Sequence, residues 1–474
     1  MKKTKIICTL GPSTEKPGVL EQLAEAGMDC ARFNFSHGDH EEHGKRFEAL
    51  KKIREESGRP IAALLDTKGP EIRLKDFKEG KVFLEKGQKF TLTTREVEGT
   101  GEIASITYKG LPMDVKAGTI ILVDDGLIEM VVEEKNETDI ICKVLNEGPV
   151  SNKKGVNVPN TRLSMPYLSE KDRDDIIFGI KMGYDFIAAS FVRTAEDVLE
   201  IRKIFEEYQC DKIKIIAKIE NKEGVDNIDD IIKVADGIMI ARGDMGVEVP
   251  GQDVPAIQKR IIKKVYQAGK QVITATQMLD SMQKNPRPTR AEISDVANAI
   301  YDGTSAIMLS GETAAGKYPV EALQMMVSIA VATENDIDYK KRFLETGPVK
   351  DNSIREAISH STVMTAHDLD AEAIISVTMS GSTARRVVKY RPNTQVFGCS
   401  TRDYVCRHLN LAWGVIPILV EEKNDTFELF DHAIDKVIEA GYLKPGDITV
   451  ITAGVPLGES GTTNLIKVQR VSGK

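Results

Sequence analysis

Lysine and carboxylate side chains that could act together in catalysis follow two neighbouring apolar runs of this 474-residue chain. Lys218 and Glu220 are two positions apart at the end of the run IKIIAKI, so an extended strand points both to one side. We expect Asp244 at the end of the next strand. Two carboxylates at adjacent strand ends suit Mg²⁺, and a lysine beside the metal can stabilise charge on a transferred phosphoryl group or an enolate. The alternative is a buried structural ion pair between Lys218 and Glu220.

A second group of polar side chains follows two earlier apolar runs, ARFNF and IAALL. Arg32, Asn34 and Ser36 alternate along the first, and Asp66 and Thr67 end the second. Arginine is suited to pair with a phosphate or a carboxylate. The other four residues offer oxygens that include a single carboxylate, which favours a monovalent cation over Ca²⁺ or Mg²⁺. The alternative is that Asn34 and Asp66 only cap turns.

Two further features each have a functional and a purely structural interpretation. Thr276 ends the run QVITA and either anchors a substrate carboxylate, lies on a proton relay, or caps a helix. The segment Ser380-Gly381-Ser382-Thr383 opens an expected helix that carries two arginines. Small residues at a helix start expose backbone N–H groups and form an anion site, or they act only as an N-cap.

Two motifs resemble binding sites, but we do not expect either of them to bind a ligand. The stretch GETAAGKY nearly matches a nucleotide-binding loop, but Tyr318 stands where a small hydroxyl should ligate Mg²⁺. His37, His40 and His43 are spaced like metal ligands, and a solvated acidic first helical turn explains them better.

The elements that would position these side chains recur along most of the chain. Eight apolar runs each end in polar or glycine residues and precede an amphipathic stretch, which predicts a closed (β/α)8 barrel with its active site at the carboxyl ends of the strands. The runs are Lys5–Leu10, Ala31–Phe35, Ile61–Leu65, Phe186–Phe191, Ile213–Ile219, Gly237–Ile240, Gln271–Ala275 and Ala306–Leu309.

The βα rhythm is interrupted once and ends before the chain does. Residues 70–166 show short alternating strands and glycine turns, which predicts an inserted small β-barrel that acts as a lid. Ser169 is the expected N-cap where the helices resume. We therefore predict an α/β protein: a (β/α)8 TIM barrel from 1–69 and 167–337, the lid, and a C-terminal α/β regulatory domain with a mostly parallel sheet at 338–474.

Composition excludes several classes of protein. Lys and Arg number 64 against 72 Asp and Glu, so the net charge of −8 leaves no basic excess for general nucleic-acid binding. No apolar run approaches the roughly 18 residues that span a bilayer, so we expect no membrane segment. The six cysteines are scattered without a C-x-x-C pair, which fits a reducing cytoplasm better than a disulfide framework.

Taken together, the motifs resemble the pyruvate kinase family over essentially the whole chain. They occur in the family's order as RFNFSHG, DTKGPEIR, IIAKIENKEG, ARGDMG, TATQML and MLSGETAAGKY. The resemblance implies phosphoryl transfer from phosphoenolpyruvate to ADP, giving pyruvate and ATP, in the final step of glycolysis. It also implies Mg²⁺ (or Mn²⁺) and K⁺ as cofactors and a homotetramer.

The resemblance assigns roles to residues that match the family's motifs. Catalysis would fall to Lys218, Arg32 and Thr276, and phosphoenolpyruvate would be bound by Arg32, Lys218, Gly243, Asp244 and Thr276. Mg²⁺ would be held by Glu220 and Asp244, and K⁺ by Asn34, Ser36, Asp66 and Thr67. The nucleotide would contact Asn34, Phe35, Ser36, His37, Arg73 and, from the lid, Lys154. An effector would bind at Ser380, Gly381, Ser382 and Thr383.

Two departures qualify the resemblance. Asn160 stands where family members often carry glycine after the V-P of the lid, which bears on the flexibility of that hinge. The stretch after the expected strand at 448–453 lacks the Trp-Arg of fructose-bisphosphate-activated relatives. We therefore expect a sugar monophosphate or a nucleotide as effector, or none. A Mg²⁺-dependent barrel lyase acting on a pyruvate enolate and a non-catalytic phosphometabolite sensor are the rival hypotheses.

Overall fold

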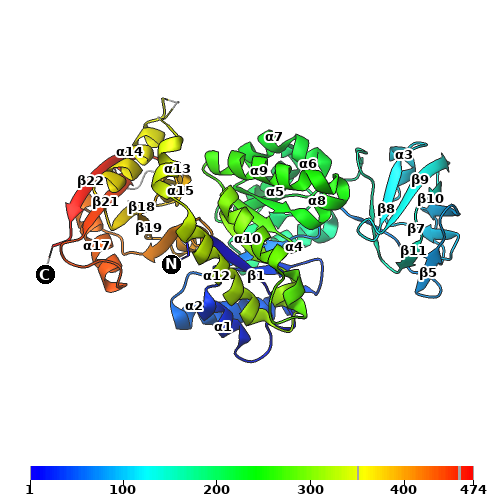
Figure 1. The fold of residues 1–474 in the computed structure, drawn as a ribbon, viewed down its shortest axis with the longest axis horizontal. Coiled ribbons are helices and arrows are strands. Elements are labelled where there is room, and N and C mark those ends of the chain that lie inside the picture. The colour runs from blue at the N-terminus through cyan, green and yellow to red at the C-terminus, as the bar shows by residue number, and fades with distance from the viewer. Residues whose placement is uncertain (1, 348, 350–351, 457–460, 473–474) are drawn as a thin grey trace.

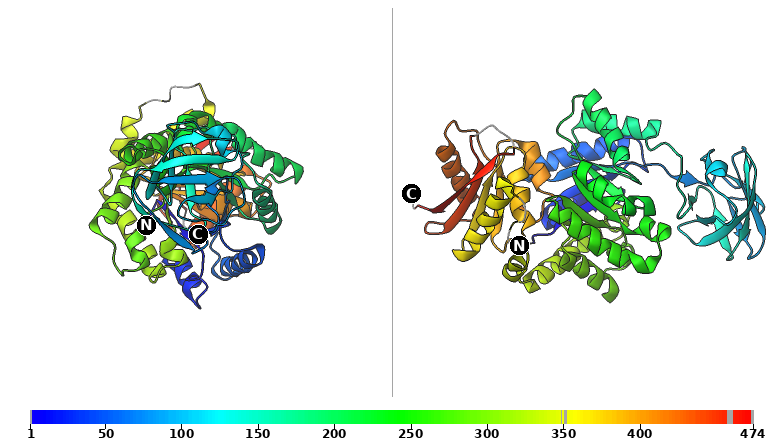
Figure 2. Two further views of the ribbon diagram at one scale, coloured as in Figure 1. Left: turned by 90° about the vertical axis from the view of Figure 1, so that its right-hand side faces the viewer. Right: turned by 90° about the horizontal axis from the view of Figure 1, so that it is seen from above.

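The computed structural model describes residues 2–347, 349, 352–456 and 461–472. Its three parts lie in a row, with the large barrel in the middle, the inserted domain at one end and the C-terminal domain at the other (Figures 1 and 2). In the described parts of the chain, no helix has the length and apolar character needed to cross a membrane.

Eight parallel strands form the closed barrel that the sequence predicts, in the order β1-β17-β16-β15-β14-β13-β3-β2. The strands are β1 (Lys5–Thr9), β2 (Cys30–Asn34), β3 (Ala62–Asp66), β13 (Phe186–Ala189), β14 (Lys214–Ile219), β15 (Gly237–Ala241), β16 (Gln271–Ala275) and β17 (Ala306–Leu309). Nearly all of their residues are buried, because one face fills the barrel and the other packs under helices.

Helices cover the outside of the barrel. They are α1 (Val19–Ala26), α2 (His40–Ser57), α4 (Glu170–Met182), α5 (Ala195–Glu207), α6 (Lys222–Asp226), α7 (Ile228–Val234), α8 (Arg242–Glu248), α9 (Val254–Gln267), α10 (Arg290–Asp302), α11 (Gly311–Ala314) and α12 (Pro319–Asp336). Short 3-10 turns occupy Gly251–Asp253 and Asp280–Gln283. The predicted cap at Ser169 is confirmed: its hydroxyl accepts the Asp172 N–H and the Asp172 carboxylate bonds back, a reciprocal capping box.

The inserted domain is a small barrel that closes through one bridge. Its seven-stranded sheet has the order β4-β12-β8-β9-β10-β6-β7, and an antiparallel bridge between Leu74 and Ile106 joins its two ends. Strands β5 and β11 pair separately, and β6 and β7 run parallel. The elements are β4 (Ile72–Arg73), β5 (Lys81–Leu84), β6 (Lys89–Thr93), β7 (Ile103–Ser105), α3 (Leu111–Asp114), β8 (Ile120–Val123), β9 (Ile128–Lys135), β10 (Asp139–Val144), β11 (Gly148–Ser151) and β12 (Gly155–Asn157).

The C-terminal domain has a five-stranded sheet in the order β20-β19-β18-β21-β22, in which only β22 is antiparallel, so the mostly parallel prediction is confirmed. Separate apolar clusters pack on its two faces. The elements are α13 (Tyr339–Glu345), α14 (Ile354–Asp368), β18 (Ala373–Val377), α15 (Ser382–Lys389), β19 (Gln395–Ser400), α16 (Asp403–Leu409), β20 (Val415–Leu419), α17 (Thr426–Glu439), β21 (Ile448–Gly454) and β22 (Thr463–Arg470). The domain boundaries placed at residues 69/70, 166/167 and 337/338 stay predictions.

The C-terminal domain packs against the amino-terminal ends of the barrel strands. Leu411 belongs to the apolar cluster inside the barrel. Lys5 Nζ donates to the Val415 carbonyl at 2.7 Å, and Asn410 Nδ2 donates to the Asp29 carbonyl at 2.9 Å. The carboxyl ends of the strands, where Lys218 and Asp66 lie, are therefore left to face the inserted domain.

Candidate active site

Lys218 lies one residue before the end of β14, and its side chain is buried. Its Nζ is 3.0 Å from Glu220 Oε1 and 3.0 Å from Asp66 Oδ1, and it donates to Ser190 Oγ at 2.7 Å. Burial would lower the pKa of Lys218, but the two carboxylates outweigh burial and hold the pKa above its usual value. The predicted shared face of Lys218 and Glu220 is present, and so is the ion pair that was its structural alternative.

Arg32 contacts the carboxylate of Asp66 through the oxygen that Lys218 does not contact. Its Nε donates to Asp66 Oδ2 at 2.6 Å, and its Nη1 donates to the Thr9 hydroxyl at 3.0 Å. Burial acts to raise the pKa of Asp66, yet Arg32 and Lys218 together bring the pKa below its ordinary range. Asp66 is therefore an ionised group between two cations at the mouth of the barrel.

Glu220 and Asp244 interact electrostatically across neighbouring elements. Burial raises the pKa of Glu220 to about 7; Lys218 opposes the rise, and the negative charge of Asp244 adds to it. The expectation that Asp244 ends a strand is wrong. β15 stops at Ala241, and Asp244 is the third residue of the short helix α8, because the chain turns into a helix directly after the strand.

Thr276 connects the end of β16 to the start of α8 through its hydroxyl. It accepts the Gly243 N–H at 2.8 Å and donates to its own neighbour, the Ala275 carbonyl, at 2.6 Å. Its φ of 68° lies in the left-handed region, where a β-branched residue is strained by about 1–3 kcal/mol. Thr276 thus caps α8, the helix that carries Asp244, rather than the helix that follows its own strand.

The residues assigned to K⁺ gather at the ends of β2 and β3. Asn34 is the register partner of Asp66, so their side chains start from adjacent strands. Asn34 Oδ1 accepts the Ser36 N–H at 3.1 Å, and the Thr67 hydroxyl accepts the Ser190 N–H at 3.1 Å. The structure brings Asn34, Asp66 and Thr67 together, whereas the Ser36 side chain is exposed to solvent.

Ser190 is a residue of this site that the sequence analysis missed. Its hydroxyl lies 3.1 Å from Asp66 Oδ1 and donates to the Thr67 carbonyl at 2.6 Å, besides its bond to Lys218. The signal was a lone polar residue in the run FIAASF, just past the end of β13. Such a residue at the carboxyl end of a barrel strand should have been counted with the others.

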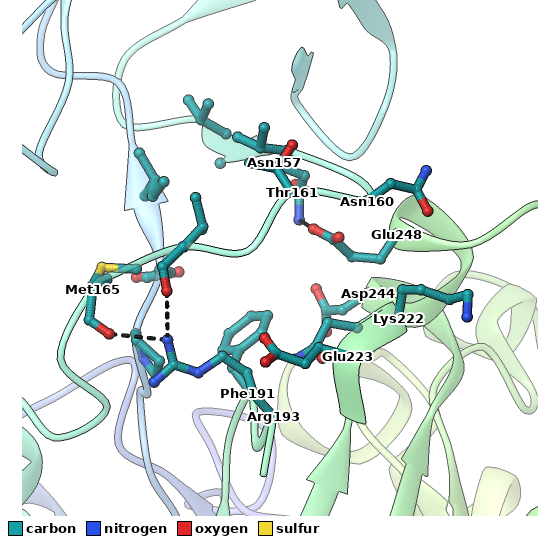
Figure 3. Close-up of a pocket in the computed structure, with 18 of the residues that line it drawn as sticks. Asn157, Asn160, Thr161, Met165, Phe191, Arg193, Lys222, Glu223, Asp244 and Glu248 are labelled. Atoms are coloured by element: carbon teal, nitrogen blue, oxygen red, sulfur yellow. Dashed lines mark hydrogen bonds between the residues drawn. The ribbon is translucent and has the colours of Figure 1, made fainter. Parts of the chain in front are cut away.

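A cavity of about 700 Å³ lies between the barrel and the inserted domain (Figure 3). Asp244 lines it from α8, and Arg73 and Lys154 line it from the inserted domain. The two parts are joined across the cavity by a hydrogen bond from Asn157 Nδ2 to Glu248 Oε1 at 2.8 Å. The cavity does not include the remaining predicted site residues, which are Arg32, Asn34, Phe35, Ser36, His37, Asp66, Thr67, Lys218, Glu220, Gly243 and Thr276.

The two lid cations have partners in this arrangement. Arg73 Nε donates to Glu71 Oε1 at 2.7 Å, and Lys154 Nζ lies 2.8 Å from Asp124 Oδ1. Asn160 also lines the cavity, with a φ of 58°. Asparagine tolerates this left-handed conformation better than most residues.

The predicted effector segment borders a separate cavity of about 270 Å³ in the C-terminal domain. Ser380, Ser382 and Thr383 line it together with Arg402 and Lys423. Gly381 is the N-cap of α15 with a φ of 77°. The cavity is therefore lined by small residues, by two cationic residues and by one acidic residue, Glu422.

Contacts within the protein explain the glycine-rich stretch GETAAGKY and the histidine-rich segment. In GETAAGKY, a Cβ on Gly316 would lie 2.4 Å from the Glu312 carbonyl, so this glycine serves a tight turn against α11. His40 Nε2 lies 2.7 Å from Asp175, and the His43 ring stacks on Phe35 at 3.9 Å. Within the described part of the chain, no group of three or more His, Cys, Asp or Glu side chains is placed to hold a metal ion.

Comparisons with known proteins agree along the whole chain. The family model described as "Pyruvate kinase, barrel domain" matches residues 1–323, and "Pyruvate kinase, alpha/beta domain" matches residues 356–469. A pyruvate kinase of Geobacillus stearothermophilus is 52% identical over 473 residues, 99% of this chain and 81% of the relative. One of Clostridium acetobutylicum is 52% identical over 472 residues, 99% of this chain and 100% of the relative.

A solved structure is similar over the same length. The crystal structure of a pyruvate kinase from Cryptosporidium parvum matches with a TM-score of 0.94 and 39% sequence identity, covering 99% of this chain and 96% of that chain. The lyase hypothesis finds no support among these relatives. The chain therefore belongs to the pyruvate kinase family, and it is a phosphotransferase that converts phosphoenolpyruvate and ADP to pyruvate and ATP.

Proposed function

We propose that phosphoryl transfer takes place at the carboxyl end of the barrel, with Lys218, Arg32 and Thr276 as catalytic residues. The observation that carries this proposal is the position of Lys218 Nζ, 3.0 Å from both Asp66 and Glu220, with Arg32 on the far side of Asp66. Two cations are thereby concentrated where a substrate with several negative charges must bind. Such positioning and charge neutralisation account for most of the catalysis of phosphoryl transfer.

Glu220 and Asp244 would hold Mg²⁺ or Mn²⁺. The donor set fits, because the carboxylate that follows β14 and the carboxylate on α8 repel each other, and a divalent cation would remove that repulsion. Asn34, Ser36, Asp66 and Thr67 would hold K⁺, since their oxygens carry only one carboxylate. When bound, the metal ions would neutralise the phosphate oxygens that the protein cations do not reach.

The protein's own groups would bind and orient phosphoenolpyruvate. Arg32 and Lys218 would exchange their bonds to Asp66 for bonds to the phosphate, and Lys218 would stay beside the charge that develops during transfer. Gly243, Asp244 and Thr276 would position the rest of the substrate at the start of α8. The hydroxyl of Thr276 fixes the N–H of Gly243, so the two act as one unit.

The nucleotide would bind between the barrel and the inserted domain. Arg73 and Lys154 line the cavity that separates the two. Asn34, Phe35, Ser36 and His37 stand outside it, so contact with all six residues requires the inserted domain to move toward the barrel. Closing a lid over the substrates also excludes water from the reaction.

We further propose an effector site, a homotetramer and a cytoplasmic location. A sugar monophosphate or a nucleotide would bind at Ser380–Thr383, supported by the nearby cations Arg402 and Lys423. All six cysteines are free, and five of them are buried, which is the cysteine usage of a reducing compartment.

Pyruvate formation from phosphoenolpyruvate tests the catalytic assignment. We expect turnover to require both ADP and Mg²⁺, and Glu220→Gln to raise the Mg²⁺ concentration needed for half-maximal rate by tenfold or more. Glu207→Gln is the matched control, because Glu207 is exposed at the end of α5, where it pairs with Arg173 of α4. An unchanged Mg²⁺ requirement in Glu220→Gln would remove Glu220 from the metal site, and pyruvate formed without ADP would contradict the reaction itself.

A further inference from the structure

A small cavity lies where the C-terminal domain meets the amino-terminal end of the barrel. Its volume is about 170 Å³, well below the roughly 300–1,000 Å³ of sites for drug-sized ligands. Lys214 lines it from the start of β14, Arg385 from α15 and His408 from α16. The cavity therefore has walls from both domains and room only for a small group.

The charges around this cavity are unbalanced. Its walls carry four cationic side chains, Lys214, Lys270, Arg385 and Arg386, and one carboxylate, Asp236. Among the residues that the structure describes, no carboxylate is within ion-pairing distance of the first three. Asp236 pairs instead with Arg202 at 2.6 Å, and Arg386 has a separate partner in Glu356.

Several donors at the cavity have unused capacity. The Arg385 guanidinium, which has five N–H groups, makes one side-chain hydrogen bond within the described chain, from Nη1 to the Ser380 carbonyl at 3.2 Å. His408 is 2% exposed, and its Nε2 finds no hydrogen-bond partner among the described residues. A buried polar atom without a partner destabilises the folded state, so a ligand that accepts a hydrogen bond from this nitrogen would remove that cost.

The cations also act on one another. Burial lowers the pKa of Arg385; Asp236 opposes the shift, and Arg386 adds to it. Burial likewise lowers the pKa of Lys270, and the positive charges of Arg202 and Arg385 lower it further. An anion placed among these groups would offset both the burial and the repulsion.

We propose that this cavity binds a small oxyanion of the size of inorganic phosphate, held by Lys214, Arg385 and the Nε2–H of His408. Guanidinium and ammonium groups recognise phosphate oxygens through charge-assisted hydrogen bonds. The anion would tie α15 to the barrel, because its ligands belong to both domains. The site is distinct from the effector cavity, whose cations are Arg402 and Lys423, although Ser382 borders both cavities.

The single tryptophan provides a local signal for a test. Trp413 lines a narrow void beside the cavity, together with Lys270 and Arg385. We would titrate the full-length protein with inorganic phosphate at constant ionic strength and follow the fluorescence of Trp413. The expected result is a saturable change that is at least tenfold weaker in Lys214→Gln and in Arg385→Gln. The control Arg402→Gln, which alters only the effector cavity, should bind as the unmodified protein does.

Selenate in place of phosphate locates the anion directly. Crystals soaked in selenate should show an anomalous peak between Arg385 and Lys214, and the peak should be missing in Arg385→Gln. Turnover of phosphoenolpyruvate and ADP by both variants shows that they are folded, since neither residue belongs to the proposed active site. A fluorescence change lost in Arg402→Gln but kept in Arg385→Gln would overturn the proposal, as would selenate found only at other sites.

Discussion

Lys218 and Glu220 leave the same strand end on the same side, and the ammonium nitrogen of Lys218 lies 3.0 Å from the carboxylate of Glu220. The pair can serve structure alone or chemistry alone, and the two cases differ in what its loss does. If the pair is structural, breaking it should lower the stability of the protein, because a buried charge is left without a partner. If Lys218 is catalytic, replacing it should reduce turnover while the protein still folds and binds substrate.

Lys218→Met should lower kcat by several orders of magnitude and leave phosphoenolpyruvate binding measurable. The physical reason is that methionine fills the space of lysine but cannot stabilise charge in the transition state. Steady-state kinetics and a direct binding titration measure the two quantities. Lys233→Met is the control, since Lys233 is exposed and pairs with Asp230 on α7, away from the cavity. Near-normal turnover in Lys218→Met would refute the catalytic role.

Replacing K⁺ by tetramethylammonium at equal ionic strength should reduce turnover at least tenfold. In this structure Arg32 and Lys218 neutralise Asp66. When substrate binds, we expect both cations to turn toward it. A small monovalent cation must then balance Asp66, and the methyl groups of an organic cation keep its charge farther from the oxygens of Asn34, Asp66 and Thr67 than K⁺ would be. Equal rates in the two salts would show that these oxygens hold no K⁺.

His408 should make the junction of the two domains sensitive to acid. Burial lowers the pKa of His408 to about 4, and Asp185 opposes the shift, whereas Lys214, Arg385 and Arg407 favour it. A depressed histidine pKa contributes stability above the unfolded value of about 6.5, and this stability is lost as the pH falls toward 4. The loss corresponds to about 3 kcal/mol when complete.

Thermal unfolding of His408→Gln measures this contribution. Glutamine does not titrate, so the difference in Tm between the variant and the unmodified protein should shrink as the pH falls from 6.5 to 4. A difference that stays constant over this range would show that His408 is not held neutral by burial. Asp185 has a separate role, because it also pairs with Arg54 and Arg407.

Ser382→Asp should abolish activation by any sugar monophosphate that binds the C-terminal domain. The new carboxylate would stand at the start of α15, inside the effector cavity, and would repel a phosphate. Activation curves with and without the sugar phosphate measure the effect. Thr426→Asp, at the start of α17 in the same domain, is the control for added charge. Unchanged activation in Ser382→Asp would move the effector site elsewhere.

The sequence determined the repeating architecture of this protein. The predicted runs Gln271–Ala275 and Ala306–Leu309 coincide with β16 and β17, residue for residue. A strand buried on both faces needs an uninterrupted apolar run, and that requirement can be seen without knowing what surrounds it. Alternation along a strand likewise placed Lys218 and Glu220 on one side.

Only the tertiary structure decided which side chains meet. Lys218 contacts Asp66 across 152 positions of the chain because β13 pairs with both β14 and β3, and Ser190 joins them from the end of β13. The capping of α8 by the Thr276 hydroxyl and the unbalanced cations around Arg385 also depend on contacts between distant segments. Local sequence governs the conformation of a strand, whereas long-range packing sets the distances on which charge–charge interactions and hydrogen bonds depend.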